Sequence, residues 1–185
     1  MSDEQIIQHG APTLAGLKTG NIFNCSYDDK DLLMKEIRRT NKQLRKKGLC
    51  IIPLRFSEHR ALIYIYRPSS LSKDLSDVRA KDILRTAGYS ASQNAAEYIQ
   101  ELTKRLKTAK REDFPHEIGL FLSYPPEDVD GFINNHASNK CTGTWKVYGD
   151  VQTAKLTFAR YEKATRIYQQ CWDRGVSLQK LAIAK

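Results

Sequence analysis

Two β-rich runs decide the fold class of this chain, and both lie in residues 49–67, which read LCIIPLRFSEHRALIYIYR. Leu49–Phe56 and Arg60–Arg67 are rich in β-branched and aromatic residues, and only the polar triplet Ser57–His59 separates them. This spacing is typical of an antiparallel hairpin. Because Pro53 has no backbone N–H to donate to a ladder, the first arm is expected at a sheet edge or at a bulge.

Helical patterns surround the hairpin. Before it, Asp29–Lys47 carries apolar residues at helical spacing, and Gly48 supplies a stop. After it, several short helices precede the longest one, which is expected from Gly149 to Gly175. The sequence therefore predicts an α+β fold in which several helices pack on a small, mostly antiparallel sheet, with strands near 21–27, 49–56, 60–67 and 144–148.

The size and the ends of the chain bear on its class. At 185 residues and 21.2 kDa, with no repeat or long linker, residues 1–185 are expected to form a single domain. No stretch is apolar enough for a membrane span. The segment Met1–Glu4 is acidic where a signal peptide would be basic and then apolar, so the cytoplasm is the expected location. The opening His9–Gly20 is expected to hold only a short helical turn around Pro12–Leu17.

The charge of the chain raises the question of nucleic-acid binding. Thirty basic side chains against 21 acidic ones give a net charge of +9. Residues 30–60 hold ten basic and three acidic side chains, and 104–111 add five basic ones, whereas 112–131 carry six acids and no Lys or Arg. These blocks fall on separate predicted segments, which favours solvated outer helix faces. Nucleic-acid binding through the basic helix faces is kept as an alternative.

Several motifs that would identify a reaction are missing from the sequence. Gly16–Thr19 looks like the end of a P-loop, but extra residues separate its landmarks and no βαβ pattern follows. The four histidines lack a zinc-protease spacing, there is no C-x-x-C pair, and G-x-S-x-G is absent. No metal site is predicted, no cofactor is identified, and the physiological partner stays open.

Two places could still carry catalysis. His116 and Glu117 are the one acid/base pair that is adjacent in sequence, although a capping role at a helix start explains them better than a general-base role does. Cys141 lies beside Thr142 and Gly143 in a polar loop, where a thiol could be reactive. An enzyme of unknown reaction that uses His116, Glu117 or Cys141 is therefore one alternative.

The favoured reading is a binding module with a polar cleft. Three segments combine turn residues with aromatics and a histidine or cysteine, namely His9–Gly20, Phe114–Pro126 and Cys141–Asp150. They are expected to meet around one pocket for a small anionic ligand or an acidic protein partner. The cations, hydrogen-bonding groups and aromatic walls of this site would be Lys18, Arg67 and Lys146, then His9 and His116, then Tyr66, Tyr124 and Tyr148.

The same segments carry a resemblance to a known family. HGAPTLAGLK from His9, FPHEIG from Phe114 and WKVYGD from Trp145 resemble a bacterial family of small cytoplasmic proteins, found mainly in anaerobes and known only as a domain of unknown function. The resemblance covers nearly the whole chain and implies one coherent domain but no reaction. Gene neighbourhoods in this family imply a role in iron or redox physiology. Many relatives have Cys where this chain has Gly10, which argues here against a function that depends on a thiol at that position.

Overall fold

The fold comes from a computed structural model that describes residues 1–90, 94–110, 112–134 and 139–184. The described chain forms two compact units. Unit 1 contains residues 1–69 and 161–185, and unit 2 contains residues 70–160. The predicted α+β class is confirmed, since helices predominate and the strands pair in antiparallel fashion. The expectation of a single domain stays a prediction.

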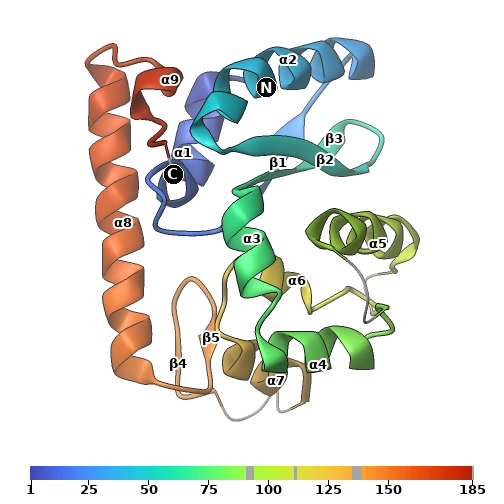
Figure 1. Ribbon diagram of the computed structural model, residues 1–185. Helices are drawn as coiled ribbons and strands as arrows, with labels where there is room; N and C mark the ends of the chain where they lie inside the picture. The colour runs from blue at the N-terminus through green and yellow to red at the C-terminus, as the bar shows by residue number, and fades with distance from the viewer. Residues whose placement is uncertain (91–93, 111, 135–138, 185) are drawn as a thin grey trace. The chain divides into compact units, whose positions relative to one another are not determined.

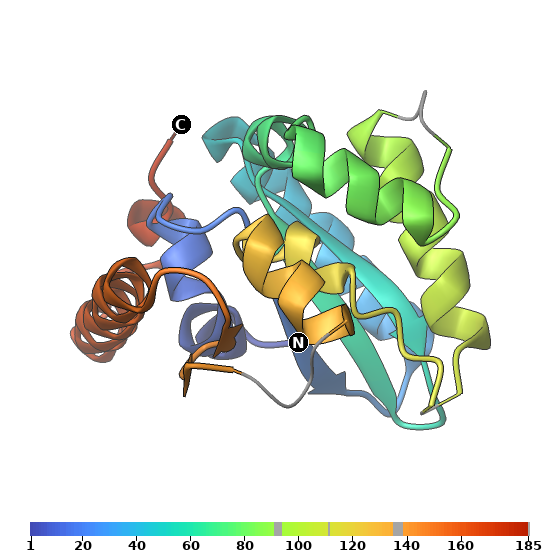
Figure 2. The same cartoon turned by 90° about the horizontal axis from the view of Figure 1, so that it is seen from below.

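The sheet of unit 1 has the strand order β1-β3-β2, in which β1 is Gly20–Ser26, β2 is Cys50–Phe56 and β3 is Arg60–Tyr66. Both pairings are antiparallel, so the hairpin prediction is confirmed (Figures 1 and 2). β2 is an edge strand, and its register shifts between Pro53 and Arg55. Pro53, which has no N–H to donate to a ladder, thus lies in an edge strand and beside a bulge, where a donor is not needed.

Helices cover one face of this sheet. α2 spans Lys30–Leu44 and continues into the 3-10 turn η1, Arg45–Lys47, before Gly48 ends it with a φ of 71°. The side chains that α2 buries are the apolar stripe of the sequence, Leu33, Ile37, Thr40 and Leu44. Leu33, Ile37 and Leu44 pack in one core with residues of β3, of the N-terminal helix and of α9 (Leu178–Leu181), including Ala61, Ile63, Ile65, Ile6, Leu14 and Leu181.

The N-terminal segment differs from the prediction. α1 runs from Asp3 to Leu14, whereas only a short turn around Pro12–Leu17 was expected. Ser2 and Gln5 form a capping box that starts the helix, and Pro12 lies inside its last turn. The prediction was wrong because Gly10 and Pro12 were read as turn residues, whereas both are buried in the helix, Gly10 against Ile65 of β3, and this burial outweighs their poor helix propensity.

Unit 2 is mostly helical. Its complete helices are α4 (Val78–Thr86), α5 (Ala95–Thr108), α6 (Ile118–Phe121) and α7 (Pro126–Asn134). α3 (Pro68–Asp74) and α8 (Val151–Asp173) each contain residues of both units. α6 and α7 follow one another as two short helices (Figures 1 and 2). The positive φ of Ser123, 55°, lies in the turn between them.

The fourth predicted strand is shorter than expected and does not join the main sheet. β4 (Cys141–Thr142) and β5 (Lys146–Val147) pair only with one another, in an antiparallel two-stranded sheet. Gly143, Thr144 and Trp145 form the turn between these strands. No helix within the described ranges combines the length and the apolar character that crossing a bilayer would require.

Candidate functional site

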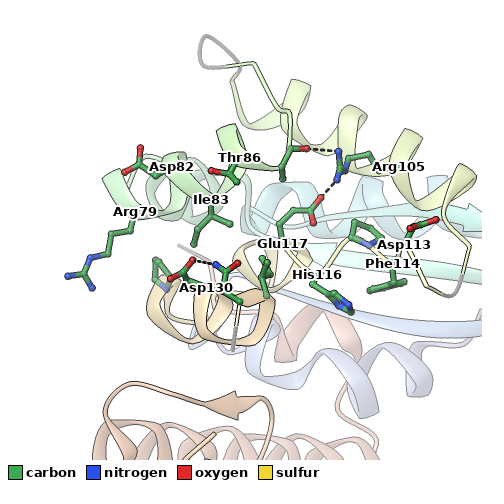
Figure 3. A pocket seen from close by; sticks show the side chains of 15 residues that line it. Arg79, Asp82, Ile83, Thr86, Arg105, Asp113, Phe114, His116, Glu117 and Asp130 are labelled. Carbon is green, nitrogen blue, oxygen red and sulfur yellow. Dashed lines mark hydrogen bonds and ion pairs between the residues drawn. The ribbon is translucent and has the colours of Figure 1, made fainter. Parts of the chain in front are cut away.

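One hollow of unit 2 is a cavity of about 700 Å³, which we call the α4–α7 cavity. α4 and α7 supply two of its walls, Arg105 of α5 contributes to a third, and the loop 113–117 completes it (Figure 3). Its lining residues are Arg79, Asp82, Ile83, Thr86, Ala87, Arg105, Asp113, Phe114, Pro115, His116, Glu117, Pro126, Asp130, Ile133 and Asn134.

Apolar and charged groups share this lining. Ile83, Phe114 and Ile133 give it apolar surface, whereas its ionisable residues include four carboxylates and two guanidinium groups. Figure 3 shows the Arg79 side chain extending away from Glu117 and His116. The cavity is therefore acidic, although the chain as a whole carries a charge of +9.

A buried network forms part of the cavity wall. Glu117 is 4% exposed, and its Oε1 lies 2.9 Å from Nε of Arg105 and accepts a hydrogen bond from the Tyr89 hydroxyl at 3.0 Å. Nη1 of Arg105 donates to the carbonyl of Ala87 at 2.6 Å. Burial, followed by the neighbouring Glu117 carboxylate, raises the pKa of Tyr89, so its hydroxyl stays protonated and can donate.

His116 lies at the loop that separates two hollows. It is exposed and lines the α4–α7 cavity, and it also lines a smaller pocket of about 170 Å³. In this second pocket the ring of His116 meets Phe132 edge-on at 4.9 Å, and Nζ of Lys146 lies 5.3 Å from the same Phe132 ring. Tyr124 stacks on Trp145 at 5.0 Å in its wall.

Two of the three predicted segments therefore meet in unit 2. Phe114–Pro126 and Cys141–Asp150 together line the smaller pocket through His116, Tyr124 and Lys146. Tyr148 is not one of the residues that line this pocket, and its hydroxyl is buried without a hydrogen-bond partner in the described part of the chain. Segment His9–Gly20 belongs to unit 1, as do Tyr66 and Arg67.

Arg67 has a different role from the one expected of it. It is 1% exposed, and its guanidinium donates to the carbonyls of Thr13, Leu14, Lys47 and Ile183 at 2.8–3.1 Å. Four of the five N–H groups of an arginine are thus used within unit 1. This geometry makes Arg67 a structural cation that binds three backbone segments, at residues 13–14, 47 and 183.

The other unit 1 candidates lie in separate surroundings. His9 is exposed and stacks on Phe23 with the ring centroids 5.2 Å apart. Lys18 is 5% exposed, its Nζ lies 5.7 Å from the centre of the Tyr161 ring, and burial lowers its pKa to about 8. Tyr66 stacks on Tyr64 at 4.7 Å, and burial raises its pKa to about 12.

The remaining candidates concern thiol and metal chemistry. Cys141 is half-buried in β4. It lines neither the α4–α7 cavity nor the smaller pocket. All four cysteines are free thiols. Across residues 1–90, 94–110, 112–134 and 139–184, no three or more His, Cys, Asp or Glu side chains gather as a metal would need.

The sequence prediction missed Arg105, which lines the cavity, and Tyr89, which donates to Glu117 behind the lining. A signal for Arg105 existed, because Tyr98, Leu102 and Arg105 follow one another at helical spacing and the first two are buried. An arginine on such a stripe needs an internal acceptor. Its partner Glu117 is twelve positions away in sequence, and only the fold brings the two together.

Comparison with known proteins gives a family but no activity. No curated protein and no solved structure matches the chain. One family, described as "Protein of unknown function (DUF3793)", matches residues 6–182. This match spans nearly all of both units, and the chain therefore belongs to the DUF3793 family of proteins of unknown function.

Proposed function

We propose that this protein is a binding module whose small-molecule ligand occupies the α4–α7 cavity. The observation that carries the proposal is a hollow of about 700 Å³ whose wall contains the buried carboxylate of Glu117. Small-molecule sites have volumes of roughly 300–1,000 Å³, with mostly apolar walls and a few placed polar groups. Ile83, Phe114 and Ile133 supply such walls, and Glu117 supplies a fixed acceptor.

The charge of the cavity bears on the ligand. An anion was expected from the sequence, with Lys18, Arg67 and Lys146 as its cations. The N–H groups of Arg67 donate to backbone carbonyls, and Lys146 lines the smaller pocket. Because carboxylates outnumber guanidinium groups in the α4–α7 cavity, Coulomb energy there favours a neutral or cationic ligand. Binding of an anion or acidic partner near Lys146 and His116 stays a prediction.

Catalysis is the second candidate function, and His116 is the residue that keeps it open. His116 is exposed at the α4–α7 cavity, where its imidazole could exchange protons with a bound molecule. Glu117 is a weaker base candidate, because Arg105 and Tyr89 already engage its Oε1. An ordinary His116 titration by NMR, together with no turnover of any bound molecule, would argue against the enzyme.

A cavity-filling variant tests the binding function. Ile83→Trp places a bulky ring in the cavity, whereas Leu156→Trp makes a comparable change at a site that is 68% exposed and outside it. Protein purified from its native host is analysed by native mass spectrometry. We expect a small bound mass on the wild type and on Leu156→Trp but not on Ile83→Trp. Retention of that mass by folded Ile83→Trp, or its absence from the wild type, would count against the proposal.

A further inference from the structure

The arrangement around Glu117 leaves one carboxylate oxygen for a ligand. Both of its protein contacts, Arg105 Nε and the Tyr89 hydroxyl, reach Oε1. Within the described chain, Oε2 accepts no hydrogen bond, although the residue is only 4% exposed and lines the α4–α7 cavity. Oε2 is not among the fully buried atoms that lack a partner, so a donor in the cavity can reach it, and its open acceptor positions can take a charge-assisted hydrogen bond.

Arg105 is held in a way that keeps Oε2 accessible. An arginine often grips a carboxylate with two parallel N–H groups, one to each oxygen. Here Nη1 turns instead to the Ala87 carbonyl at 2.6 Å, and Nε approaches Oε1 of Glu117 (Figure 3). The pair is therefore one-sided, and a second cation can approach Glu117 from the cavity without displacing Arg105.

The rim of the cavity favours the same sign of charge. Asp113 and Asp130 are exposed carboxylates of the lining, and Asp130 accepts a hydrogen bond from Asn134 at 2.8 Å. Asp82 is paired with Arg85 at 2.9 Å and adds little field of its own. Arg105 already pairs with Glu117, and the Arg79 side chain extends away from Glu117 (Figure 3), so Asp113 and Asp130 set the sign of charge at the rim beside Glu117, which attracts a positive group and repels an anion.

From these observations we propose that the ligand of the α4–α7 cavity is an organic cation with an apolar body, whose protonated nitrogen donates to Oε2 of Glu117. The apolar body would pack on Ile83, Phe114 and Ile133. A charge-assisted hydrogen bond in this sheltered place is stronger than one at the surface. The inference rests on the proposed function, because it names the chemical class of the ligand for the same cavity.

Three probes of one shape and different charge test this inference. Benzamidine is a cation, benzamide is its neutral counterpart, and benzoate is the anion. Titrations followed by NMR of the backbone amides should place benzamidine at Ile83, Glu117 and Ile133, with an affinity at least tenfold above that of benzamide. Benzoate is expected to bind most weakly. Raising the salt concentration should lower the affinity for benzamidine and leave the affinity for benzamide unchanged.

Two substitutions separate Glu117 from the other acids. Glu117→Gln should lower the benzamidine affinity about tenfold or more and change that of benzamide less than twofold. Glu127→Gln, an exposed position of α7 outside the lining, should change neither. If Glu117→Gln does not fold, the ranking of the three probes on the wild type still decides the matter.

The outcomes distinguish this inference from the function beneath it. If benzoate binds as tightly as benzamidine, the inference that the ligand is a cation is wrong, but the proposed binding function is not affected. Absence of binding by all three probes at millimolar concentration also overturns the inference. In either case the binding function stands or falls by the comparison of Ile83→Trp with Leu156→Trp.

Discussion

The indole N–H of Trp145 donates to Oδ2 of Asp128 across 2.6 Å, and both side chains are buried. Oδ1 of the same carboxylate accepts from the backbone N–H groups of Tyr148 and Gly149, each at 2.7 Å. One carboxylate of α7 thus collects three donors from the segment 145–149. This explains why a segment with almost no regular structure can hold a fixed shape beside the smaller pocket.

Replacing Asp128 tests the importance of this contact. Asp128→Asn removes the charge and sets an amide N–H₂ against donors, so we expect a loss of about 2–4 kcal/mol in the free energy of unfolding. Urea denaturation followed by tryptophan fluorescence measures it. The neighbouring Glu127→Gln is exposed and should change the free energy by less than about 0.5 kcal/mol. An equal effect of the two substitutions would contradict the role given to Asp128.

Arg67→Lys should destabilise unit 1 although it keeps the positive charge. One ammonium cannot reach all four carbonyls that the guanidinium serves, so buried acceptors lose their donors. We expect a loss of about 2–4 kcal/mol by chemical denaturation. Arg39→Lys, on the exposed face of α2, is the matched control and should be nearly neutral. A small loss at Arg67 would show that water can replace the missing donor.

The stability of the protein should depend on pH through Lys18. Burial lowers its pKa in the folded state from 10.5 to about 8. Between these values the unfolded chain binds more protons, so this group's contribution to the free energy of unfolding rises with pH. The unfolding free energy of the wild type minus that of Lys18→Met should increase by about 2 kcal/mol between about pH 7.5 and pH 10. A flat or falling difference would mean that Lys18 stays charged when buried.

The cysteines should react with iodoacetamide in an order set by burial. Cys25 is 1% exposed and should react last, and burial raises the pKa of the Cys50 thiol, which slows it as well. Mass spectrometry of peptides from a time course at neutral pH gives the rate at each site, and denatured protein serves as the control. Fast, selective alkylation of Cys141 would instead favour the thiol-dependent enzyme among the alternatives.

Sequence patterns predicted the hairpin and α2 because both depend on local order. Runs of β-branched and aromatic residues on either side of a polar triplet specify the two strands, and the stripe from Leu33 to Leu44 specifies the helix. α1 escaped prediction because burial of Gly10 and Pro12 against other elements decides it. Its capping pair, Ser2 and Gln5, was nevertheless visible in the sequence.

The candidate site was harder to predict than the fold. The sequence pointed to the segments around His116 and Lys146, and the structure brings these two residues to one pocket. The cavity itself depends on Arg105 and Glu117 meeting from different elements, and no spacing rule encodes such a contact. Charge sums also misled, because a chain with a net charge of +9 folds around an acidic hollow.

The way in which unit 1 is assembled from two separated stretches has a consequence for biosynthesis. Tyr168, Leu178 and Leu181 complete the core around β3, and the carbonyl of Ile183 accepts one of the Arg67 N–H groups. The strands of unit 1 are synthesised first, but their core can be completed only after residues 161–183 have been synthesised. Unit 2 is contiguous in sequence and can fold earlier. The nascent β1–β3 sheet, with its apolar face uncovered, is the stage at which chaperones would be needed most.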